Sequence, residues 1–174
     1  MAKKIYLFVL VALSVLTASA WDGEGTESSP YLIKTKADLI ELCTQTNVSL
    51  LTYDGVYFKM TADIDLEGDT QFTGIATTSS NNTKRFSATF DGDGHAIHGI
   101  NIDAMDWKVA PTETSLGTPN GTKCTNNVGF IGYLGVKGTL KNLVIARDNK
   151  FVLFGYGAAL VGRNYGTVMS SQLC

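Results

Sequence analysis

Three segments of the chain carry apolar residues at the same unequal spacing, with a step of three residues followed by a step of two. They are Ile97–Ile102, Leu140–Ile145 and Val168–Leu173, in which the first, fourth and sixth positions are apolar except for Ser171. Gly99 and Asn142 stand between the first two of these positions, and both residue types tolerate turns. A flat half-buried strand would alternate strictly. The spacing therefore predicts short strands that bend and then resume.

A short phrase also recurs in the second half of the chain. Gly129–Gly132 is followed by Gly138–Leu140, and Ala159–Gly162 is followed by Gly166–Val168. The first elements are about 30 residues apart and the second about 28, which is typical of one unit in a stacked repeat architecture. A repeat that cannot bury its own apolar face must pack on a neighbour. The expected fold class is all-β, built from stacked strand repeats.

One short helix is expected near residues 37–43. Leu39, Leu42 and Cys43 fall on one helical face, and Thr35 is a suitable N-cap with Asp38 three residues later. This helix is expected to cover the open end of the stack, because an uncovered repeat exposes apolar surface and unpaired strand edges.

Several further segments have the pattern of strands. Phe58 and Met60 alternate with polar neighbours, and Ile64 and Leu66 are expected to face inward while Asp63 and Asp65 face outward. The expected strands are residues 30–33, 57–60, 64–66, 86–90 and 96–102, with a tight turn at residues 91–94.

The first 20 residues are expected to be a secretory signal peptide. Lys3 and Lys4 precede the apolar run Ile5–Leu16, and Ala18–Ala20 supplies small residues for cleavage before Trp21. Removing two lysines leaves 12 Lys and Arg against 16 Asp and Glu, a net charge of −4. This balance does not favour a nucleic-acid partner. The mature protein is expected to be secreted or at the cell surface, and not to span a membrane.

The mature chain is expected to have two parts. Residues 21–55 form an entry and capping segment, and residues 56–174 form the strand repeats, with residues 103–127 as a long loop excursion rich in Pro, Gly, Thr and Asn. The last repeat ends on apolar residues with no cap after it. This predicts either further repeats or self-association through the last repeat, with Cys174 prone to intermolecular disulfides.

The three cysteines, Cys43, Cys124 and Cys174, match no zinc-binding spacing. Export would permit one disulfide, although free or buried thiols are the favoured interpretation.

The acidic pairs Asp63/Asp65 and Asp91/Asp93 are the best candidates for chemistry. Paired carboxylates can act as acid and base in glycoside cleavage, and alternating aspartates can bind Ca²⁺ through oxygen ligands. A solvated strand face and a turn are the favoured alternative, and calcium comes next. His95 and His98 lack a partner at metal-ligand spacing and are expected to be structural. No catalytic residue and no bound cofactor is predicted.

Four aromatic residues are candidates for ligand binding: Trp107, Tyr133, Tyr156 and Tyr165. Exposed aromatic rings can stack on sugars or fill a pocket of a partner protein. For Tyr133 and Tyr156 the competing interpretation is packing beside the Gly-rich turns.

The chain resembles the bacterial surface proteins that carry GLUG repeats. The resemblance rests on Trp21–Thr26, Pro30–Ile33 and Ala37–Leu39 as the entry segment, and on Phe58–Leu66 and Phe90–His95 as the first rungs. The four-residue signature appears as Gly129–Gly132 and Ala159–Gly162, in which Phe130 replaces Leu and Ala159 replaces Gly. The resemblance implies a right-handed parallel β-helix that is exported and adhesin-like. Some relatives resemble immunoglobulin-A-specific metallopeptidases, but the His-Glu-x-x-His motif of that activity is absent from this sequence.

The expected function is adhesion or recognition without catalysis, with a surface glycan or a host or matrix protein as partner. One alternative is a polysaccharide lyase or glycoside hydrolase on the same architecture. Another is a structural stalk within a larger surface protein.

Overall fold

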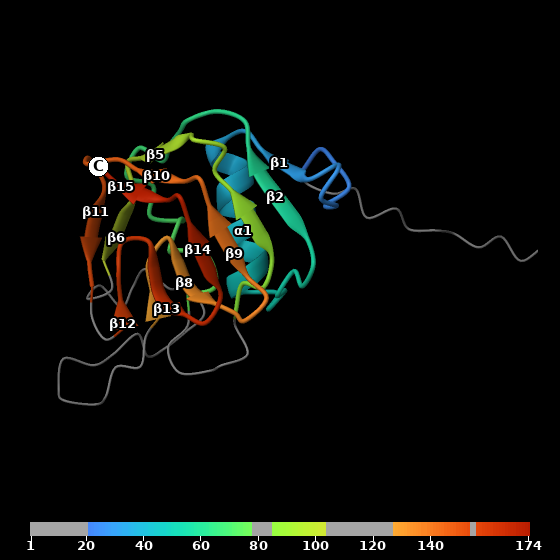
Figure 1. Ribbon diagram of the computed structural model, residues 1–174. Coiled ribbons are helices and arrows are strands. Elements are labelled where there is room, and N and C mark those ends of the chain that lie inside the picture. The colour runs from blue at the N-terminus through green and yellow to red at the C-terminus, as the bar shows by residue number, and fades with distance from the viewer. Residues whose placement is uncertain (1–20, 78–84, 104–126, 154–155) are drawn as a thin grey trace, which may run out of the picture.

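The computed structural model describes residues 21–77, 85–103, 127–153 and 156–174, and short strands dominate it (Figure 1). Within these ranges the single helix is α1, Lys36–Asn47. The all-β class expected from the sequence is confirmed. The expected signal peptide, Trp107 and Cys124 lie outside the described residues. No helix among the described residues is long and apolar enough to cross a membrane.

The strands form five sheets, and every strand pair in them is parallel. One sheet has the order β1-β2-β4-β9-β14, and a second has the order β15-β10-β5-β3. The three remaining sheets are the pairs β6/β11, β7/β12 and β8/β13. The strand bounds are β1 Tyr31–Ile33, β2 Tyr57–Met60, β3 Ile64–Asp65, β4 Thr89–Asp91, β5 Ala96–His98, β6 Asn101–Asp103, β7 Asn127–Val128, β8 Ile131–Leu134, β9 Thr139–Lys141, β10 Val144–Ile145, β11 Lys150–Val152, β12 Tyr156–Gly157, β13 Val161–Asn164, β14 Thr167–Met169 and β15 Gln172–Leu173.

The recurring phrase of the sequence corresponds to strands that pair with each other. Ile131 in β8 pairs with Val161 in β13, 30 residues later, and Thr139 in β9 pairs with Thr167 in β14, 28 residues later. We use the word layer for a run of consecutive strands that pairs, strand by strand, with the next such run. Each apolar side chain consequently lies on its counterpart in the neighbouring layer.

The core is built by this register. Phe58, Phe90, Leu140 and Val168 occupy matching positions in β2, β4, β9 and β14, and the first three are fully buried. Burial of such a side chain contributes about 1.5–3 kcal/mol relative to exposure. The stack of apolar side chains is therefore the main contribution that holds the layers together.

The segments with apolar residues at steps of three and two form short strands that bend and then resume, as predicted. Ile97, Ile100 and Ile102 are all buried, and the chain bends between β5 and β6 at Gly99, which has a φ of +64°. The equivalent bend between β9 and β10 lies at Asn142, with a φ of +54°. Gly and Asn tolerate this left-handed conformation, which is why the sequence places them at the bends.

The last glycine of each copy of the phrase lies against backbone. A Cβ atom on Gly132 would lie 2.5 Å from the Asn127 carbonyl oxygen, and one on Gly162 would lie 2.5 Å from the carbonyl oxygen of Val128. Real Cβ contacts are longer than this. Only glycine fits where the chain passes so close to a neighbouring strand.

Helix α1 begins as predicted and ends later than predicted. The Thr35 side chain accepts a hydrogen bond from the Asp38 N–H, and the Asp38 carboxylate accepts one from the Thr35 N–H, which completes a capping box. Leu39, Leu42 and Cys43 are buried as expected. The sequence pattern stopped at Cys43 because the following residues are polar.

Those polar residues continue the helix because they bind the segment before β4. Thr46 Oγ1 accepts a hydrogen bond from the Ala76 N–H at 3.1 Å. The Asn47 side chain donates to the Gly74 carbonyl at 2.8 Å and accepts from the Thr77 N–H at 2.9 Å. Figure 1 shows α1 behind the sheet strands, with β13 and β14 toward the viewer.

Candidate ligand-binding surface

Three of the tyrosines singled out from the sequence surround one arginine. The Arg163 guanidinium carbon lies 5.4, 6.0 and 5.1 Å from the ring centroids of Tyr133, Tyr156 and Tyr165. The rings of Tyr133 and Tyr165 are themselves 5.6 Å apart. We call these four residues the tyrosine–arginine cluster. Cation–π contacts at such distances are worth about 0.5–1 kcal/mol each at exposed sites.

The strand register assembles this cluster. Tyr133 in β8 and Arg163 in β13 are direct register partners, so they lie side by side on neighbouring layers. Tyr156 begins β12, and Tyr165 follows β13 at a turn in which the Gly166 N–H donates to the Asn164 side chain. Residues up to 32 positions apart in the sequence therefore meet at one place.

The cluster combines exposed aromatic rings with a fixed positive charge. Tyr156 is 58% exposed and Tyr165 is 52% exposed, whereas Tyr133 is half-buried. Arg163 Nη2 donates to the Tyr165 hydroxyl at 2.8 Å, and this hydrogen bond is the main reason that the pKa of Arg163 is raised. Rings held in this way can stack on the apolar face of a sugar, while the guanidinium can bind hydroxyl, carboxylate or sulfate oxygens.

Arg163 was missed by the sequence reasoning, although a signal for it was present. When the two copies of the recurring phrase are aligned, Gly132 matches Gly162, and the next residues, Tyr133 and Arg163, occupy the same position. An arginine stacked on a tyrosine across two repeats could have been read from that alignment. Trp107, the fourth aromatic candidate, lies outside the described residues.

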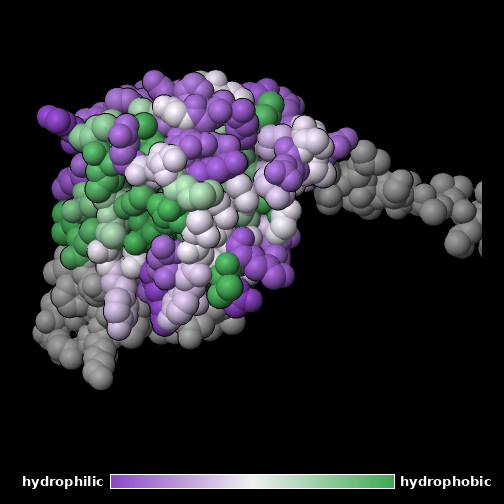
Figure 2. Space-filling view, in the orientation of Figure 1, coloured by the Kyte–Doolittle hydropathy of each residue, from purple (hydrophilic) through white to green (hydrophobic). Residues whose placement is uncertain are grey.

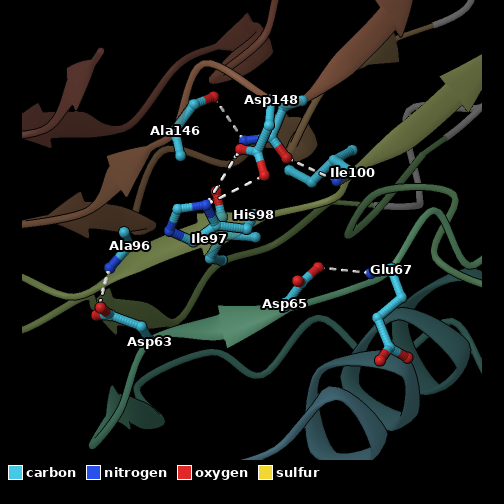
Figure 3. Close-up of polar contacts among 10 residues, drawn as sticks. Asp63, Asp65, Glu67, Ala96, Ile97, His98, Ile100, Ala146 and Asp148 are labelled. Carbon is cyan, nitrogen blue, oxygen red and sulfur yellow. Dashed lines mark hydrogen bonds and ion pairs between the residues drawn. The ribbon is translucent and has the colours of Figure 1, made fainter.

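The first acidic pair does not share a partner. Asp63 accepts hydrogen bonds from the Ala96 N–H at 2.9 Å and from His95 Nδ1 at 3.0 Å. These bonds, that of Ala96 first, lower the pKa of Asp63. Asp65 instead accepts from the Glu67 N–H at 2.7 Å, so it closes its own turn. Figure 3 shows the two carboxylates directed at these different partners.

The second acidic pair is also divided. Asp91 accepts from Asn142 Nδ2 at 2.9 Å and lies 3.1 Å from Lys141 Nζ, whereas Asp93 pairs with Lys59 Nζ at 3.0 Å. Burial alone raises the pKa of Asp91, but the bond from Asn142 and those from the Asp93 N–H and Lys141 reverse this and lower it. Both aspartates therefore join strands of neighbouring layers, a role that fits the solvated-face and turn interpretation.

The two histidines each find a carboxylate in another segment. His95 Nδ1 lies 3.0 Å from Asp63 Oδ1. His98 Nδ1 lies 3.1 Å from Oδ1 of Asp148, which is 50 positions later in the sequence, and Figure 3 shows this second pair. Within the described part of the chain, no three His, Cys, Asp or Glu side chains gather in a way that could hold a metal ion. Cys43 is buried and Cys174 is exposed, and both are unpaired thiols in the described structure.

Comparison with known proteins finds distant relatives. A Gly-rich membrane protein of Evansella cellulosilytica is 30% identical over 152 residues, which is 84% of this chain and 14% of that protein. Halomucin of Haloquadratum walsbyi is 26% identical over 160 residues, which is 89% of this chain and 2% of halomucin. The chain thus spans a small part of each relative. No family model matches the chain, and no solved structure matches it.

Proposed function

We propose that this chain belongs to an exported surface protein that binds a glycan without catalysis, through the tyrosine–arginine cluster. The observation that carries the proposal is the convergence of Tyr133, Tyr156 and Tyr165 on Arg163. Two of the rings expose more than half of their surface, so they are accessible to a ligand.

The architecture that we propose for this function is a right-handed parallel β-helix with α1 near its first layer. Parallel strands joined through long crossovers are right-handed in nearly all known cases. The exclusively parallel pairing and the 28- to 30-residue register support this assignment. An elongated stack of this kind carries a side-chain cluster on its flank, where a large polysaccharide can reach it.

The surface location is supported by the names of the relatives. One is named as a Gly-rich membrane protein and the other as halomucin. Together with the basic, apolar and small-residue order of residues 1–20, these names favour export of this chain. Amino-terminal sequencing of the exported protein should then read Trp-Asp-Gly from Trp21.

The binding test is a glycan array followed by titration calorimetry on the best hits. Tyr156→Ala and Tyr165→Ala should each weaken binding about tenfold, since a stacking aromatic ring contributes about 1–3 kcal/mol. Arg163→Lys keeps the charge but loses the planar guanidinium, so acidic glycans should be weakened more than neutral ones. Val136→Ala is the matched control, because Val136 is an exposed apolar residue outside the cluster.

Two results would contradict the proposal. Unchanged binding by both tyrosine variants would place the ligand elsewhere. Polysaccharide turnover that disappears in Asp63→Asn or Asp91→Asn would favour the carbohydrate-active enzyme instead.

A further inference from the structure

A second arginine lies in line with the tyrosine–arginine cluster. Phe86 and Leu134 are bridge partners, and the Phe86 N–H donates to the Tyr133 carbonyl at 2.9 Å. Arg85, the residue before Phe86, is therefore at the register position of Tyr133. Tyr133 is in turn the register partner of Arg163. Arg85, Tyr133 and Arg163 consequently occupy one column across three neighbouring layers.

The Arg85 side chain lies on the outer surface of this column. Phe86 and Leu134 are fully buried, and side chains alternate between the two faces of a strand, so the residue before each of them faces outward. Arg85 is accordingly exposed, and a Cβ atom on Gly135 would lie 3.1 Å from its Cδ atom. No described carboxylate forms an ion pair with Arg85, whereas several lysines are paired in this way: Lys34, Lys36, Lys59, Lys137 and Lys141. The positive charge of Arg85 is therefore available to a ligand.

The column places an aromatic ring between two positive charges at a regular spacing. Neighbouring parallel strands lie about 4.8 Å apart, so the backbones of Arg85 and Arg163 are roughly 10 Å apart, with Tyr133 between them. Figure 2 shows hydrophilic and hydrophobic residues side by side over β12, β13 and β14, on the face turned toward the viewer. A mixed surface of this kind suits a ligand that has both apolar ring faces and polar or charged groups.

The part of the chain that forms β8 and β13 is poor in acidic residues. Of the 16 Asp and Glu residues in the sequence, 13 lie at positions 21–103, and Asp148 alone lies at positions 127–174. The Asp148 carboxylate is bonded to His98 of β5, which belongs to a different sheet from β8 and β13. Positions 127–174 also contain five basic residues, so this part is positive although the whole chain has a net charge of −2. Such a charge distribution attracts anionic ligands.

We propose that the ligand is an anionic glycan with carboxylate or sulfate groups, and that Arg85 determines this specificity together with Arg163. The inference rests on the glycan-binding function proposed above and restricts it to one chemical class. The glycan chain runs across the layers, with an acidic group at each guanidinium and a sugar face on the Tyr133 ring. A planar guanidinium matches the paired oxygens of a carboxylate or sulfate. Two guanidinium groups in one column favour a polymer with repeated charges over a neutral polymer or a single charged sugar.

The test compares two acidic probes, polygalacturonate and heparin oligosaccharides, with neutral dextran oligosaccharides in titration calorimetry on the protein. At least one acidic probe should bind more tightly than dextran, and added salt should weaken that binding because it screens exposed charges. Arg85→Gln should weaken the acidic probe about fivefold, the loss expected from one exposed ion pair, and leave dextran binding unchanged. Arg147→Gln is the matched control, because it removes the same charge at an exposed position on the turn between β10 and β11. Its affinity for every probe should equal that of the parent.

The outcomes separate this inference from the proposed function. Dextran binding that equals acidic binding, depends on Tyr156 and Tyr165 and is unchanged in Arg85→Gln would overturn the inference and leave the proposed function standing. Equal losses of acidic binding in Arg85→Gln and Arg147→Gln would also overturn it, because net charge would then explain the attraction. Absence of binding to every glycan would overturn both proposals. The melting temperature of Arg85→Gln should equal that of the parent, since the side chain is exposed, so a loss of binding is not a loss of folding.

Discussion

The side chain of Asn149 is bonded to the backbone of Ile97, a residue 52 positions earlier in the neighbouring layer. Asn149 Nδ2 donates to the Ile97 carbonyl at 2.7 Å and to the Ala146 carbonyl at 2.8 Å, and its Oδ1 accepts from the Ile100 N–H at 2.6 Å. One partly buried amide thus satisfies two backbone groups at the bend between β5 and β6 and a third, the Ala146 carbonyl, in its own layer. It links two layers at a point where the regular ladder is interrupted.

Asn149→Ala should destabilise the protein by about 2–3 kcal/mol, because it leaves backbone groups without partners at a partly buried bend. Urea unfolding followed by circular dichroism measures the loss. Arg147→Ala, at an exposed position on the same turn, should change the free energy of unfolding by less than about 0.5 kcal/mol. Equal effects of the two substitutions would mean that the amide does not join the layers.

Gly132→Ala should destabilise by roughly 1–3 kcal/mol or more, since the new methyl group meets the Asn127 and Ala76 carbonyl oxygens at 2.5 and 2.7 Å. Gly162→Ala should behave similarly, because its neighbours are the Val128 and Tyr156 carbonyls. Thermal unfolding provides the measurement. Val136→Ala, at a side chain that is 79% exposed, should leave the melting temperature nearly unchanged. An unchanged melting temperature for Gly132→Ala would show that the strands can separate at this point without loss of stability.

Asp63 should make stability depend on pH in the acidic range. Its folded-state pKa lies below the ordinary value of 3.8, first because of the Ala96 N–H bond and then because of His95. The carboxylate therefore stabilises the fold above pH 3.8, and this contribution is lost as the pH falls through the lowered folded pKa. Asp63→Asn should be less stable than the parent at neutral pH, with the difference shrinking below pH 3.8.

The Asp63 prediction is checked by urea unfolding across the acidic range and by NMR titration of the carboxyl group. Glu24→Gln, at an exposed residue of the entry segment, is the control and should keep the pH profile of the parent. A constant difference between parent and Asp63→Asn at every pH would show that the side chain acts through packing alone.

Cys43 and Cys174 should differ sharply in reactivity. Cys43 is only 2% exposed, and this burial is the main reason that the pKa of its thiol is raised. Cys174 is exposed. Since the thiolate is the reactive form, iodoacetamide at about pH 8 should label Cys174 quickly and Cys43 only after unfolding. Peptide mass spectrometry in the presence and absence of urea distinguishes the sites. Rapid labelling of Cys43 in the native protein would mean that α1 detaches readily.

Positions whose environment is set by local pattern were predictable from the sequence. The alternation at Phe58 and Met60 predicted a strand with both side chains inward, and both are buried in β2. Thr35 with Asp38 predicted the start of α1, where the structure has a capping box. Where the sequence was misleading, the deciding partner lies far along the chain. Phe86 was expected inside a strand, but it forms an isolated bridge to Leu134, and the regular strand β4 begins at Thr89.

Only part of the candidate site could be predicted from the sequence, for the same reason. The tyrosines stood out by residue type, but their meeting at Arg163 depends on the pairing of β8 with β13, which no local pattern fixes. The acidic pairs looked like possible ligand sets because their residues are two apart. In the structure Asp65 closes its own turn, while Asp63 binds a strand that begins 33 residues later.

The strands β14 and β15 are each paired on one side only among the described strands, which gives the molecule a direction under load. Because β14 and β15 are bonded only to β9 and β10 among the described strands, a pulling force applied beyond Leu173 acts on one layer at a time. Each detached layer would release about 28 residues, or roughly 95 Å of extended chain, before the next layer bears the tension. A stack of such layers lengthens in steps and dissipates energy at each step.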